Sequence, residues 1–166
     1  METETPFKAN DSTAVYTLCR PASAEEILSQ ARIILEERFK PGTVIRSPSD
    51  THNFLIAQLA HLEHEVFAVI FLDNRHKIIA FEILFHGTID GTSVYPREVA
   101  KKALTLNAAA VILAHNHPSG VPEPSSAEER ITHRLKSALE LIDTRLLDHI
   151  IVGGTQTVSL AERGLV

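Results

Sequence analysis

The sequence has 166 residues, which is enough for one domain with little to spare. With 44% hydrophobic and 22% charged residues, its composition is that of an ordinary globular protein and excludes disordered, collagen-like and coiled-coil classes. No apolar run approaches the ~18–20 residues that a membrane-spanning helix needs. The formal net charge of −5 argues against general binding to the phosphate backbone of nucleic acids.

Three features of composition bear on cellular location and chemistry. The N-terminal string METETPFKANDS has neither the basic nor the apolar region of a secretory signal. The single cysteine, Cys19, cannot form an internal disulfide, so we expect a cytoplasmic protein. The sequence contains nine histidines but only one Met and no Trp, and histidine is the most common metal ligand.

In chain order, residues 1–22 show no periodicity and predict a flexible N-terminal arm. Residues 23–43 begin with a capping box and predict an N-terminal helix, and residues 44–166 predict the main domain. The elements predicted in this domain are a helix starting at Pro48, a hairpin of strands over 65–72 and 78–85, a loop over 87–92, a helix over 96–107, a strand over 108–114, a helix over 126–141, and strands over 149–152 and 157–160. This order predicts an α/β fold, a three-layer sandwich with a mixed β-sheet flanked by helices.

Two histidines, His115 and His117, follow the apolar strand Ala108–Ala114. Side chains alternate along a strand, so both imidazoles point to one side of the sheet and Asn116 points to the other. The Pro and Gly that come next turn the chain and leave the pair at the edge of the sheet. Glu128, one turn into the next helix, would complete a set of two His and one carboxylate, which is typical of catalytic zinc sites.

Two simpler interpretations stay open at this point. A His-x-His pair is explained about as well by hydrogen-bonded surface histidines. The segment Ser125-Ser126-Ala127-Glu128 also matches a capping box, in which Glu reaches back to the first amide of the helix instead of to a metal. Spacing alone favours this cap for Glu128, although a carboxylate has two oxygens and can serve both partners.

These residues match a known pattern. The string His115-x-His117-Pro118-x-Gly120, followed by Pro124-Ser125-x-x-Glu128, resembles the JAMM (MPN+) metalloprotease motif. The string HNHPSG, with VYPREV before it and LLDHIIVGG after it, resembles the RadC family in particular. The resemblance covers about residues 44–166 and implies a JAMM/MPN-like fold, related to the cytidine-deaminase-like α/β sandwich, with one Zn2+ per chain.

The resemblance also implies roles for single residues. His115 and His117 would bind zinc, and Ser125 would donate a hydrogen bond to the developing oxyanion. Glu128 occupies the position of the third ligand, which is usually Asp in this family. The extra methylene moves the carboxylate by ~1.5 Å, whereas metal sites tolerate about 0.2 Å, so we expect zinc binding with an affinity that the replacement can weaken.

JAMM enzymes also carry a glutamate that deprotonates the attacking water, near the start of the strand that follows the N-terminal helix. We predict Glu65 for this role, because it adjoins an apolar run and would lie at the rim of the sheet. Glu63, two residues earlier, and Glu82, in the next strand, are alternatives, and Glu63 and Glu65 can also simply solvate the junction. For His149, a hydrogen bond to a metal ligand is an alternative to a purely structural role.

The favoured hypothesis is a zinc-dependent hydrolase of the JAMM metallopeptidase type, in which zinc-activated water attacks an amide or isopeptide bond of a peptide or protein substrate. One alternative is a DNA-repair-associated protein that binds nucleic acid or cleaves phosphodiesters, since RadC-like proteins are commonly labelled so. The negative charge disfavours it, and the sequence is too short for the helix-hairpin-helix segment of longer RadC-like chains. The other alternative is a non-catalytic MPN interaction module.

Overall fold

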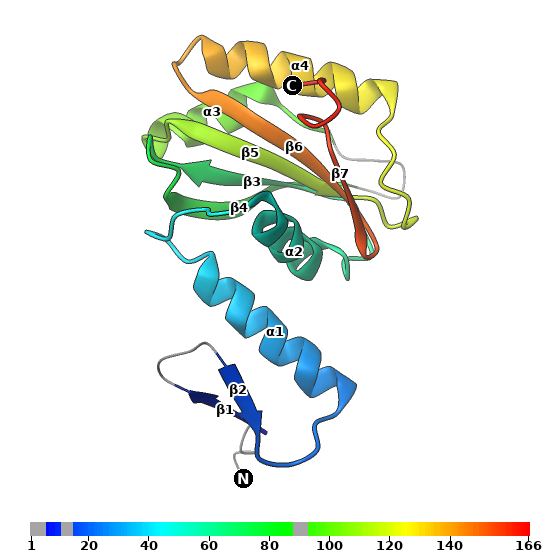
Figure 1. Ribbon diagram of the computed structural model, residues 1–166. Coiled ribbons are helices and arrows are strands. Elements are labelled where there is room, and N and C mark those ends of the chain that lie inside the picture. Colours follow the sequence, from blue (N-terminus) through cyan, green and yellow to red (C-terminus); the bar gives the residue numbers. More distant parts are fainter. Residues whose placement is uncertain (1–5, 11–14, 88–92) are drawn as a thin grey trace. The chain divides into compact units, whose positions relative to one another are not determined.

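The computed structural model describes residues 6–10, 15–87 and 93–166 (Figure 1). The chain forms two compact units, residues 1–38 and residues 39–166. Each unit is described by itself below. Most of the loop expected over residues 87–92 lies outside the described residues.

The first unit contains a hairpin of two short strands, β1 (Phe7–Asn10) and β2 (Val15–Leu18), which pair antiparallel, and a helix, α1 (Ala24–Arg38). The helix starts with the predicted capping box, in which Glu26 accepts a hydrogen bond from the Ser23 amide at 2.8 Å and donates its own amide to Ser23 Oγ at 3.2 Å. The two strands of this hairpin lie within residues 1–22, where the sequence predicted an arm and no strand.

The second unit is built on a five-stranded sheet in the order β4-β3-β5-β6-β7. Its strands are β3 (Val66–Leu72), β4 (Ile78–His86), β5 (Ala110–Asn116), β6 (Arg145–Gly153) and β7 (Gln156–Ser159). Only β5 and β6 run parallel, and the other pairs in this sheet are antiparallel, so the sheet is mixed. The predicted hairpin of β3 and β4 is present, with a turn at Asp73 that caps the amides of Arg75 and Lys77.

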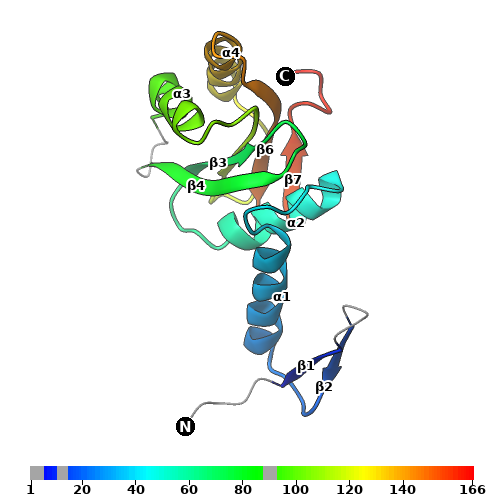
Figure 2. The same ribbon diagram turned by 90° about the vertical axis from the view of Figure 1, so that its left-hand side faces the viewer.

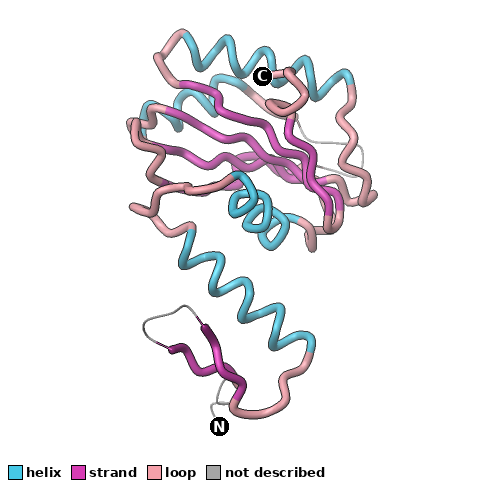
Figure 3. Tube along the Cα trace, viewed as in Figure 1, coloured by secondary structure: helices cyan, strands magenta, loops and turns pink. Residues whose placement is uncertain are grey.

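Helices cover both faces of this sheet (Figures 1 and 2). Helix α2 (Pro48–Leu59) lies on one face, and α3 (Pro96–Thr105) and α4 (Ser126–Glu140) lie together on the other. The coloured trace in Figure 3 shows the resulting alternation of helix and strand. These three layers confirm the predicted α/β sandwich.

One cluster of the hydrophobic core lies between the sheet and the layer of α3 and α4, and buried side chains of α2 (Phe54, Leu55 and Leu59) belong to the core as well. This cluster consists of buried side chains from alternate positions of two neighbouring strands and from both helices: Phe67, Val69, Phe71, Val111, Leu113, Val99, Ala103, Leu135 and Leu139. Strand β5 continues two residues beyond its predicted end, because His115 pairs with both neighbouring strands and Asn116 pairs with β6. The apolar alternation of β5 therefore carries His115 onto the same face as the core.

Candidate metal centre

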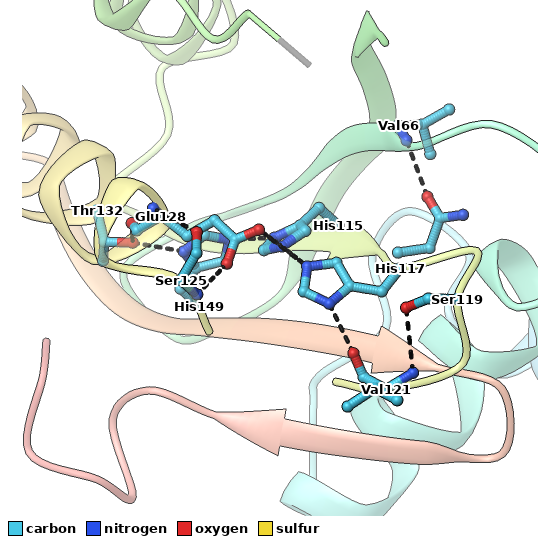
Figure 4. A network of polar contacts seen from close by, with 10 residues as sticks. Val66, His115, His117, Ser119, Val121, Ser125, Glu128, Thr132 and His149 are labelled. Atoms are coloured by element: carbon cyan, nitrogen blue, oxygen red, sulfur yellow. Dashed lines mark hydrogen bonds and ion pairs between the residues drawn. The ribbon is translucent and has the colours of Figure 1, made fainter. Parts of the chain in front are cut away.

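The two predicted histidines lie at the end of β5, beside the first turn of α4 (Figure 4). His115 is the last of the inward-facing residues of the strand, and it is only 2% exposed. His117 comes directly after the strand, and its amide donates to the carbonyl of Val152 on β6 at 2.8 Å. The pairing of the backbone thus continues through both histidines and holds their side chains on one face of the sheet.

Glu128 lies against both imidazoles. Its Oε1 is 2.9 Å from Nε2 of His117 and 3.2 Å from Nε2 of His115, and the two Nε2 atoms are 3.0 Å apart. These three side chains form a group that could hold a metal ion. The longer side chain of Glu, compared with the usual Asp of the JAMM motif, therefore still brings a carboxylate oxygen to the histidines.

The spacing and chemistry of this group fit zinc. Four ligands placed tetrahedrally at the usual zinc distance of about 2.0–2.1 Å lie roughly 3.3 Å apart. The three atoms of the group are 2.9–3.2 Å apart, so an ion would need them to separate by only a few tenths of an ångström. Two imidazole nitrogens and one carboxylate oxygen leave a fourth position for another ligand.

The capping box and the metal group use different oxygens of Glu128. Oε2 accepts a hydrogen bond from the Ser125 amide at 2.5 Å, and Ser125 Oγ accepts one from the Glu128 amide at 3.3 Å. The predicted cap is therefore present, and the other oxygen of Glu128 lies against the two imidazoles, so the cap leaves this oxygen available for a metal. Ser125 lies at the start of α4, with its side chain beside the carboxylate (Figure 4).

The electrostatics of the group are those of a tightly coupled acid and base. Burial by itself would raise the pKa of Glu128, but the polar contacts with the imidazoles of His115 and His117 and with the Ser125 amide outweigh it and hold this pKa well below its usual range. The hydrogen bond to Glu128 in turn raises the pKa of His117. Glu128 and His117 thus stabilise each other's charged forms.

The second ring nitrogen of His117 is fixed by a loop. Nδ1 lies 2.7 Å from the carbonyl oxygen of Val121, which can only accept, so Nδ1 carries a proton and donates. The loop is seated against β6 at Gly153, where an added Cβ would come within 2.6 Å of the backbone nitrogen of Pro122. A glycine is therefore required at this position for the loop to approach the strand.

His149, on β6, contacts the other histidine of the group. Its Nε2 is 2.9 Å from Nδ1 of His115, and its Nδ1 is 2.6 Å from Oγ1 of Thr132 on α4. The sequence offered this contact of His149 with a ligand as one option, and the structure has it. It gave no signal for Thr132, although a helical position four residues after Glu128 lies on the same face of the helix.

Asn116 points to the opposite face, as predicted, and fixes the segment that carries Glu65. Its Oδ1 accepts from the amide of Val66 at 2.8 Å, and its Nδ2 donates to the carbonyls of Leu62 at 3.3 Å and His64 at 3.1 Å. The side chain is 1% exposed. The residue between the two histidines therefore ties their strand to the backbone on both sides of Glu65.

The register of the sheet sets the direction of Glu65. Phe67 pairs with His115 on antiparallel strands, and Glu65 stands two residues before Phe67, so alternation along the chain leads us to expect its side chain on the face that carries the imidazoles. The hydrogen bond to Glu128 is the largest cause of the raised pKa of His117, and the negative charge of Glu65 adds a smaller contribution in the same direction. Glu65 is not one of the three residues of the group of potential ligands.

The two alternative glutamates are placed differently. Glu63 is exposed, in the irregular segment before β3. Glu82 pairs with Val69, further along β3 from the histidines, and its carboxylate forms an ion pair with Lys102 of α3 at 2.8 Å. Of the three glutamates considered, Glu65 has the position that best suits a base at this group.

Comparison with known proteins agrees with this arrangement. The RadC-like JAB domain family matches residues 45–165. The chain belongs to this family. The string HNHPSG and its flanking strings predicted the RadC family, and the match confirms this prediction.

Similar proteins carry the name UPF0758 protein, which states no activity. A UPF0758 protein of Vibrio cholerae is 55% identical over 149 residues, which cover 90% of this chain and 94% of that relative. A UPF0758 protein of Nitrosococcus oceani is 60% identical over 139 residues, 84% of this chain, but only 62% of that relative. One of Marinobacter nauticus is 54% identical over 145 residues, 87% of this chain and 65% of that relative. Within the described part of the RadC-like chain, no helix is long and apolar enough to cross a membrane.

Proposed function

We propose that this protein is a zinc-dependent hydrolase of the JAMM metallopeptidase type, which cleaves an amide or isopeptide bond in a peptide or protein. The observation that carries the proposal is the convergence of His115 Nε2, His117 Nε2 and Glu128 Oε1 within 3.2 Å of one another. Membership of the RadC-like JAB domain family supports it.

Each residue of the site has a proposed role that follows from its position. His115, His117 and Glu128 would hold Zn2+, and their second ring nitrogens or oxygens are engaged by neighbours that orient them. When bound, the ion would supply Lewis-acid polarisation of water and of the scissile carbonyl. Glu65 would accept the proton of the attacking water and pass it to the leaving amine. The hydroxyl of Ser125, whose oxygen already accepts from the Glu128 amide, retains its proton to donate to the oxyanion.

The first experiment is the zinc content per chain of protein purified without added metal, beside the double variant His115→Ala/His117→Ala. We expect about one zinc in the wild type and none in the variant. Absence of zinc from a folded wild type would contradict the proposal and favour a non-catalytic interaction module.

The second experiment tests the base. Peptide and isopeptide substrates are screened with the zinc-loaded wild type, and the cleaved substrate is then offered to Glu65→Gln. We expect a rate lower by about 10²–10⁴-fold with unchanged zinc content. Glu63→Gln is the matched control, since it makes the same change two residues away on an exposed side chain, and it should keep full activity. Full activity of Glu65→Gln would refute the role of Glu65.

Cleavage or binding of nucleic acid is the outcome that would replace this proposal. A nuclease screen on the same zinc-loaded protein, with binding measured at several salt concentrations, separates the two, because binding to phosphates weakens steeply with salt. The net charge of −5 leads us to expect neither activity.

A further inference from the structure

A continuous chain of hydrogen bonds leads from the ring of His115 back to the helix that carries Glu128. His115 Nδ1 lies 2.9 Å from Nε2 of His149, and Nδ1 of His149 lies 2.6 Å from Oγ1 of Thr132. Thr132 Oγ1 lies 2.7 Å from the backbone carbonyl oxygen of Glu128. His149 and Thr132 are both 0% exposed, and both ring nitrogens of His149 are taken up by these two partners.

The acceptor at the end of this series of hydrogen bonds determines which ring nitrogen of His149 and of His115 carries a proton. The carbonyl of Glu128 can only accept, so the single hydroxyl proton of Thr132 points to it. Thr132 Oγ1 must then accept from His149, which places the proton of that ring on Nδ1. A neutral His149 consequently has a lone pair on Nε2, and it accepts from Nδ1–H of His115. His115 therefore has no proton on Nε2.

This proton order matters because Nε2 of His115 is the atom that faces His117 and Glu128. An imidazole binds a metal only through a nitrogen that carries a lone pair. If these hydrogen bonds ran in the opposite direction, Nε2 of His115 would be protonated and would point a hydrogen at the place of the ion. The direction of the hydrogen bonds depends on the buried hydroxyl of Thr132.

We propose that Thr132, acting through His149, is a positioning residue that holds His115 in the tautomer able to ligate a metal through Nε2. The proposal rests on the metal centre of the proposed function, and it assigns to the first two turns of α4 a second task besides supplying Glu128. Thr132 and His149 touch neither substrate nor ion. They act on the protonation pattern of a ligand from inside the core.

The test compares two substitutions at one buried position. Thr132→Val keeps the shape of the side chain and removes the hydroxyl, whereas Thr132→Ser keeps the hydroxyl. In the metal-free wild type and in Thr132→Ser, ring ¹⁵N chemical shifts should show His115 protonated at Nδ1 and unprotonated at Nε2. In Thr132→Val both tautomers of His115 should be present. Zinc affinity, measured by competition with a chelator, should fall about 10–100-fold in Thr132→Val and change little in Thr132→Ser.

The matched control is Thr105→Val on α3. Its hydroxyl makes the same kind of bond within a helix, to the carbonyl of Lys101 at 2.8 Å, on an exposed face. This variant should leave the His115 tautomer and the zinc affinity unchanged, so that a general effect of losing such a bond is separated from the effect at the site.

Several results would overturn the proposal. One is a proton on Nε2 of His115 in the metal-free wild type, a measurement that needs no variant to fold. Others are a Thr132→Val protein that retains both tautomer and affinity, or equal losses in Thr132→Val and Thr132→Ser. If the wild type binds no zinc, the proposed function fails, but the ¹⁵N measurement on the metal-free chain still decides the role of Thr132.

Discussion

Replacing Asn116 by Ala removes the three hydrogen bonds that tie the end of β5 to the segment before β3. The amide of Val66, which is buried, loses its acceptor, at a cost of about 1–3 kcal/mol for an unsatisfied buried donor. The partly buried carbonyls of Leu62 and His64 lose one bond each, worth about 0.5–1.5 kcal/mol apiece. We therefore expect Asn116→Ala to lower the free energy of unfolding by about 2–6 kcal/mol, towards the lower value if a water molecule enters the space.

The assay is urea unfolding of the metal-free protein, together with hydrogen exchange of the Val66 amide. Exchange at Val66 should accelerate, while zinc content stays near that of the wild type, because Asn116 points away from the metal group. Asn116→Asp, which keeps the acceptor but turns a negative charge towards two carbonyls, should destabilise at least as much as Ala.

The control for this prediction is Asn74→Ala in the exposed turn after β3, which should change stability by less than about 0.5 kcal/mol. If Asn116→Ala lowers the free energy of unfolding by less than about 1 kcal/mol and leaves hydrogen exchange at Val66 unchanged, Asn116 does not hold the segment before β3 to the end of β5.

Two further predictions concern the surroundings of the metal group. Gly153→Ala would place a Cβ 2.6 Å from the backbone nitrogen of Pro122. It should therefore lower the free energy of unfolding by about 1–3 kcal/mol and weaken zinc binding, measured by competition with a chelator. The control is Thr155→Ala at an exposed position nearby, which should change neither quantity. In the metal-free chain, the raised pKa of His117 adds stability below its ordinary value of 6.5 that is lost as the pH rises through its folded pKa. The lowered pKa of Glu128 adds stability above 4.5 that is lost on acidification through its folded pKa. The difference in unfolding free energy between wild type and His117→Ala should therefore be largest between pH 4.5 and pH 6.5. A difference that stays constant from pH 4 to 9 would contradict the interaction between His117 and Glu128.

Much of the fold follows from local patterns in the chain. The apolar runs that became β3 and β5, and the Ser and Pro that begin α2, act over a few neighbouring residues, so their signal is complete in the sequence. The hairpin of β1 and β2 left no such signal, since four residues a strand are too few for a period to appear. The strand that carries His115 was predicted two residues short, because the polar side chains at its end gave no apolar pattern, although the backbone of both residues pairs with β6.

The candidate site divides in the same way. Alternation along a strand was sufficient to put His115 and His117 on one face and Asn116 on the other, and helix spacing was sufficient to find the capping box at Glu128. The partners of these residues come from far along the chain: Asn116 bonds to a segment about 50 residues earlier, and His149 bonds to His115, 34 residues before it.

What the sequence determined by itself is the set of side chains and the faces on which they lie, because alternation and helical period are local properties of the backbone. Only the tertiary structure decided how Glu128 divides its two oxygens between cap and histidines, that Asn116 holds the backbone on both sides of Glu65, and that the buried hydroxyl of Thr132 contacts His149. The physical reason is that hydrogen-bond partners and proton positions depend on distances of a few tenths of an ångström between separate elements, and these distances are fixed by the packing of the whole sheet and its helices.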